Sequence, residues 1–136
     1  MAEPGTPIEP LDRPARLQPE TRVLAAAVVA DLAELRAELA TLSPANAERA
    51  WQDLRRRIGT DPDALRGVLR DVDAGREPPE PSWLATCLLG LALYYDGACR
   101  GLSHWIPDAD RCLEMREVLS RRQAHAHALA SRLGGP

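Results

Sequence analysis

A run of chemically versatile side chains follows directly on the most apolar stretch of the sequence. A phenol, a carboxylate, a thiol, a guanidinium and an imidazole stand close together there, at Tyr95, Asp96, Cys99, Arg100 and His104. Asp96 and Arg100 are four residues apart, in the order that favours an ion pair on one helix face. We expect these residues to close one end of the hydrophobic core as a polar plug. The alternative is that they form the wall of a small pocket for a polar ligand.

Two pairs of residues could supply a nucleophile and a base, Ser103 with His104 and Cys99 with His104. Nucleophilic catalysis also needs a third group that orients the base, and hydrolases with a nucleophilic serine expose it on a sharp turn from strand to helix. The sequence around these residues has neither feature. It therefore predicts no catalytic residue and favours a protein that is not an enzyme, although this question stays open.

The cysteine and histidine residues are also candidate metal ligands. No CxxC, HxxxH or HExxH spacing occurs among them. His125 and His127 would lie about 200° apart on a helix, so they cannot bind one ion together. A site formed by Cys99, His104 and Cys112 around a loop is the remaining arrangement, but we expect buried thiols instead. The sequence thus predicts no metal and no cofactor.

The apolar stretch itself predicts the helix at the centre of the fold. Between Trp83 and Tyr95, only Thr86 and Gly90 interrupt the apolar residues, so a helix over 82–100 would be hydrophobic on every face and surrounded by protein. The run is about 13 residues long, whereas a membrane span needs roughly 20. We therefore expect a buried core helix and no membrane span.

Apolar residues at spacings of three and four predict further helices, and proline and glycine mark their ends. One helix should run from Pro19 to near Leu42, the next from Pro44 to the left-handed cap at Gly59, and a third from Asp61 to Gly75. The last should begin at 108–110, after a connection over 103–107.

We expect an all-α fold, an irregular bundle of four to five helices around a central hydrophobic helix. Its parts are an extended proline-rich arm (1–18) and a single helical domain (19–136), divided into a three-helix layer (19–75), a proline-rich linker (76–81), and the core and C-terminal helices (82–136).

Composition and charge exclude some partners. The net charge is −3 and the two signs are interspersed, so the chain lacks the basic face that nucleic acid requires. The N-terminus has no basic and apolar segments of the kind that signal secretion. Cys87, Cys99 and Cys112 are an odd number, which favours free thiols in the reducing cytoplasm. All 17 basic residues are Arg, and the sequence leaves open whether a GC-rich coding sequence or selection against lysine explains this.

The arm and the tryptophans point to protein partners. Proline and acidic residues dominate the arm, and its sizeable apolar residues are Ile8, Leu11 and Leu17. Tryptophan is enriched at protein interfaces, and the chain has three, Trp51, Trp83 and Trp105. We expect a non-enzymatic protein that acts through contacts with another protein or with itself, as an adaptor, accessory subunit, inhibitor or immunity-type partner. The alternative is a helical protein that binds a small molecule or a metal, or an enzyme, with a polar site at the end of the core helix.

Overall fold

The computed structural model describes residues 17–134, so Ile8 and Leu11 of the predicted arm lie outside the described residues. Within this range the fold is all-α, as predicted. The helices are α2 (Pro19–Leu39), α3 (Pro44–Ile58), α4 (Pro62–Asp73), α5 (Pro81–Arg100), α6 (Leu102–Trp105) and α7 (Ala109–Gly134). The four-residue α6 exceeds the predicted four to five helices, because the connection between α5 and α7 forms one helical turn.

Proline opens α2, α3, α4 and α5 at the first helical positions. There its ring fixes the backbone in a helical φ, and its missing N–H costs nothing because the first amides of a helix have no partner within it. Ser43 accepts a hydrogen bond from the amide of Asn46 (3.4 Å) and so caps α3, whose other end is closed by Gly59 with a φ of 78°. The predicted start and end of α3 are therefore confirmed.

Two predicted helix ends differ from the structure by a few residues. The residue before the first turn of α5 is Glu80, and Ser82 lies inside the helix, because Pro81 already takes the first helical position. At the end of α2, the last helical residue is Leu39 and not a residue near Leu42. The hydroxyl of Thr41 donates to the carbonyl of Glu38 (2.6 Å), and such a local bond competes with continuation of the helix.

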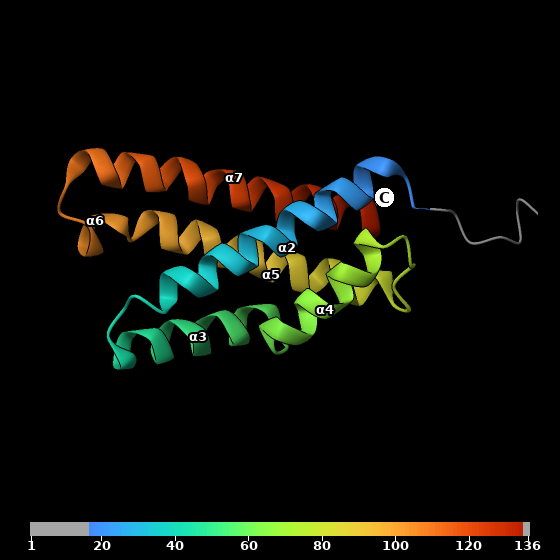
Figure 1. The fold of residues 1–136 in the computed structure, drawn as a ribbon, viewed down its shortest axis with the longest axis horizontal. Helices are drawn as coiled ribbons and strands as arrows, with labels where there is room; N and C mark the ends of the chain where they lie inside the picture. The colour runs from blue at the N-terminus through green and yellow to red at the C-terminus, as the bar shows by residue number, and fades with distance from the viewer. Residues whose placement is uncertain (1–16, 135–136) are drawn as a thin grey trace, which may run out of the picture.

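α5 packs against α7 on one side and against α3 on another (Figure 1). α7 lies antiparallel along α5, and the short α6 joins the two at one end. α2 packs on α7 and on α4, whereas α3 packs on the other side of α5. Among the helices of residues 17–134, none covers the remaining side of α5.

The prediction that α5 is covered by protein on every face is therefore wrong. Leu88 and Leu91 are fully buried, but Leu89 is 44% exposed and Leu93 is 57% exposed. With the exposed Thr86, these two leucines form a stripe at spacings of three and four, which is one face of a helix. The sequence could not reveal the exposure of Leu89 and Leu93, because these residues are as apolar as the buried leucines of the same helix.

α3 crosses α5 at Gly90, where the two backbones come unusually close. A Cβ atom at Gly90 would lie 2.0 Å from the carbonyl oxygen of Arg57, in the last turn of α3. The missing side chain of Gly90 thus permits the close packing of α3 on α5. Gly97 of the same helix makes no such contact, since a Cβ atom added there would have no neighbour within 4 Å.

This crossing yields a test by substitution of glycine. Gly90→Ala should lower the free energy of unfolding by about 1–3 kcal/mol, because α3 must move away from α5. Gly67→Ala is the matched control, since Gly67 is also helical and an added Cβ there has no neighbour within 4 Å. The control should raise the free energy by up to about 1 kcal/mol, the difference in helix propensity. Denaturant unfolding of both variants measures this, and an equal response would contradict the close crossing.

Candidate functional site

The predicted polar cluster at the end of α5 is distributed over different sides of the helix. Tyr95 is fully buried and faces the interior. Asp96 and Arg100 form the predicted ion pair (3.1 Å), but the side chain of Arg100 is 80% exposed, so the pair contributes little to stability. The Sγ of Cys99 lies 4.0 Å from the carbonyl oxygen of Arg116, and His104 is exposed on α6. None of the five predicted ligand-binding residues lines the groove described below.

Residues 17–134 contain no group of three or more His, Cys, Asp or Glu side chains close enough to bind a metal ion. The arrangement of Cys99, His104 and Cys112 considered from the sequence is therefore not formed there. His125 is instead bound to α2, with its Nδ1 2.8 Å from Oδ2 of Asp31.

The most elaborate polar cluster lies between α2 and α7, around the side chain of Arg122. This guanidinium is buried, yet it donates to Oε1 of Glu38 (2.9 Å), to Oε1 of Glu34 (3.0 Å) and to the second oxygen of Glu38. Its carbon lies 6.0 Å from the centre of the Tyr95 ring, within the range of a cation–π interaction. Burial disfavours the charge, but the hydrogen bonds and charge of Glu38 outweigh it and raise the pKa of Arg122 above its ordinary value.

Two further ion pairs continue this contact along the antiparallel helices. Asp31 meets His125, and Glu20 meets Arg132 at 3.2 Å, so α2 supplies the acids and α7 the bases. Sequence reasoning missed this ladder. Its signal was available, because Asp31, Glu34 and Glu38 lie at spacings of three and four, and Arg122 and His125 are three apart. We regard the ladder as structural, because each of its charged side chains is paired with one on the other helix.

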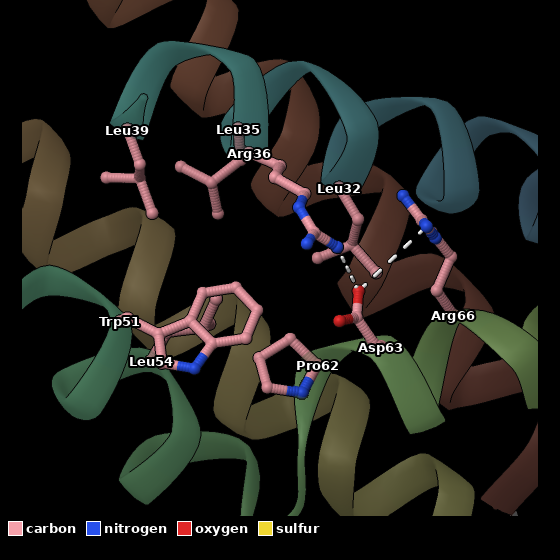
Figure 2. A pocket seen from close by; sticks show the side chains of 9 residues that line it. All are labelled: Leu32, Leu35, Arg36, Leu39, Trp51, Leu54, Pro62, Asp63 and Arg66. Carbon is pink, nitrogen blue, oxygen red and sulfur yellow. Dashed lines mark hydrogen bonds and ion pairs between the residues drawn. The ribbon is translucent and has the colours of Figure 1, made fainter. Parts of the chain in front are cut away.

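Trp51 joins three helices and does not stand free on the surface. The guanidinium carbon of Arg36 lies 5.9 Å from the centre of its ring, and Arg36 also pairs with Asp63 of α4 at 2.6 Å. Figure 2 shows the indole beside the ring of Pro62, beneath the end of α2. The cavity that these residues line measures about 10 Å³, room for about one water molecule. This predicted partner-binding residue therefore serves the junction of α2, α3 and α4.

The principal candidate site is a groove of about 500 Å³ between the end of α2, α3, the last turns of α5, and α6. Exposed apolar side chains border it: Trp105 is 64% exposed and Leu42 is 40% exposed. Of the predicted partner-binding residues that fall within 17–134, Trp105 alone lines it. Trp83 is exposed near the start of α5, and Leu17 packs partly buried against the core. The residues that line the groove are Leu39, Leu42, Asn46, Arg49, Ala50, Asp53, Arg56, Tyr94, Gly97, Ala98, Leu102 and Trp105.

The charged rim of this groove comes from α3 and is net positive. Asp53 is already paired with Arg56 (3.1 Å) and with Nε of Arg57 (3.8 Å). Arg49 lines the groove and makes no ion pair with another residue in 17–134. Burial, and then the charges of Asp53 and Glu38, raise the pKa of Tyr94 to about 12. The groove thus has an apolar floor with a neutral phenol and a cationic edge.

No protein-family model, curated protein or solved structure matches this chain. No helix in the part of the chain that the structure describes is long and apolar enough to cross a membrane.

The cluster around Arg122 predicts unequal effects of its two glutamates. Glu38→Ala removes two of the three bonds to a buried cation and should lower the free energy of unfolding by about 2 kcal/mol or more. Glu34→Ala removes one bond from a side chain that is 61% exposed, so it should cost less than about 1 kcal/mol. Denaturant unfolding compares the two variants. A cost at position 34 equal to that at position 38 would contradict the assigned geometry.

Both tyrosines of the chain should resist ionisation in alkaline solution. Burial raises the pKa of Tyr94 to about 12 and also raises the pKa of Tyr95. The unfolded chain releases these protons first, from an ordinary pKa of 10.0. The resulting stabilisation is therefore complete below about pH 10 and is lost as the pH rises towards 12. A pH titration followed by tyrosinate absorbance should therefore show no transition near pH 10. Asp53→Asn should lower the pH at which Tyr94 ionises, because it removes a nearby negative charge. Asp63→Asn is the control and should leave that pH unchanged.

Proposed function

We propose that this protein is a non-enzymatic binding protein, and that it holds a segment of another polypeptide in the groove between α2, α3, α5 and α6. The observation that carries the proposal is that Trp105 and Leu42, two exposed apolar side chains from different helical regions, line one apolar groove. Single exposed apolar residues are ordinary on protein surfaces, whereas their convergence on a concave site marks an interaction surface.

The residue types of the groove support a polypeptide ligand. Tryptophan, tyrosine and arginine dominate the binding energy of protein interfaces, and here they are Trp105, Tyr94, Arg49 and Arg56. The apolar floor would exclude water, while the arginines at the edge would select a segment that carries negative charge. Adaptor, accessory subunit, inhibitor and immunity-type partner are all roles that such a groove suits.

We place this activity in the cytoplasm. All three cysteines are free thiols, and burial raises the pKa of Cys87, which keeps that thiol protonated and unreactive. Free thiols are typical of reducing compartments. The net charge of −3 supports a protein partner over nucleic acid.

Binding of a small apolar molecule is the second candidate function, favoured by the size of the groove. Its volume of about 500 Å³ lies within the range of about 300–1,000 Å³ that is usual for small-molecule sites. Native mass spectrometry of the purified protein separates the two candidates, because a retained small molecule adds a discrete mass to the chain. The five residues predicted at the end of α5 are not needed for either candidate.

Photocrosslinking from the groove tests the polypeptide proposal. A photoreactive residue at position 105 should crosslink to one defined polypeptide segment in cells that naturally make the protein. The same residue at position 113 should not, although Leu113 is 57% exposed on α7. Leu42→Asp should abolish the crosslink by charging the groove, and Leu93→Asp on the exposed face of α5 should leave it unchanged. Equal crosslinking from both positions, or a crosslink that survives Leu42→Asp, would contradict the proposal.

A further inference from the structure

We propose that the polypeptide held in the groove is the N-terminal segment of a second copy of this chain, residues 3–12. This inference rests on the proposed function of the groove as a site for a polypeptide, and it names the occupant. Two copies that exchange these segments would form a self-associated species in which each body binds the other's N-terminus.

The sequence of the segment is suited to an aromatic groove. It reads EPGTPIEPLD, with proline at every third position, at Pro4, Pro7 and Pro10. A polyproline II helix has three residues per turn, so a ligand bound in this form would present its prolines along one edge. Ile8 and Leu11, also three apart, would form a second, apolar edge. Proline-rich ligands of this kind bind in aromatic-lined grooves and lose little conformational entropy on binding.

The charges of the segment and of the groove are complementary. The segment carries three acids, Glu3, Glu9 and Asp12, and no basic residue. With three-residue spacing these acids would form the third edge of the bound ligand. The groove presents Arg49 and Arg56 from α3, and its one acid, Asp53, is already occupied by Arg56 and Arg57. Each partner therefore provides the charge that the other lacks.

The length of chain excludes the groove of the same molecule. Leu17 lies just before α2, and Leu39 of the groove lies at the far end of that helix. The helix between them, Pro19–Leu39, has 21 residues, which corresponds to a length of about 32 Å. Leu11 is only six residues before Leu17 and reaches about 20 Å when fully extended, and Ile8 reaches about 30 Å. The apolar residues of the segment thus fall short of their own groove, so a second copy must supply them.

Self-association of the full-length chain tests the inference by sedimentation velocity over a range of concentrations. The wild-type protein should associate, and Trp105→Ala, Arg49→Glu and Leu11→Asp should each weaken association by about tenfold or more. The matched controls are Trp83→Ala, an exposed tryptophan outside the groove, and Arg55→Glu, an exposed arginine of α3 that does not line it. Both should stay within about twofold of the wild type. Circular dichroism confirms that each variant is folded.

Charge reversal identifies the contact itself. The double variant Glu9→Arg, Asp12→Arg should associate weakly, and so should Arg49→Glu, whereas a mixture of the two should recover hetero-association. A monomeric wild type up to about millimolar concentration would overturn the inference, and so would association that none of the groove variants weakens. A crosslink from position 105 to a different protein would support the proposed function but would contradict the inference that a second copy of this chain occupies the groove. The absence of any crosslink from position 105 would contradict both the proposed function and this inference.

Discussion

The buried guanidinium of Arg122 is the interaction on which the arrangement of the helices depends. A cation in the interior is costly unless it is fully hydrogen-bonded, and here two carboxylates of α2 and the ring of Tyr95 in α5 surround it. This one side chain of α7 therefore ties three helices in one register. Nε of Arg122 and the hydroxyl of Tyr95 find no hydrogen-bond partner within residues 17–134, so the cluster fixes the geometry at some cost in stability.

The same cluster determines one wall of the groove. Glu38, which binds Arg122, precedes Leu39, and the turn that follows carries Leu42. The charge of Glu38 also helps to raise the pKa of Tyr94 on the floor. The register of α2 against α7 thus places the apolar end of α2 over the groove. A substitution in the buried cluster would therefore alter the shape of the groove, although the residues of the cluster do not line it.

The opposite wall depends on a contact of a different kind, the backbone approach at Gly90. Because no side chain separates α5 from Arg57 there, the last turn of α3 lies directly on α5. α3 then diverges towards Pro44, and the space between it and the end of α5 becomes the groove, closed at its end by Trp105 on α6. A buried charge cluster and a glycine contact therefore hold the two walls of the groove in place.

The sequence by itself determined the local features of this protein. Proline at the first helical positions, the glycine at the end of α3 and the spacing of apolar residues predict the helices to within a few residues, because these signals act over single turns. The tertiary structure decided which faces meet. Leu88 and Leu89 are chemically identical, yet one is buried and the other is exposed, since only the packing of α3 and α7 distinguishes them. The site predicted from the sequence consisted of neighbours along the chain, such as Tyr95, Asp96 and Arg100. The groove is instead built from residues up to 66 positions apart, from Leu39 to Trp105. Such a site depends on long-range packing, and no local spacing records it.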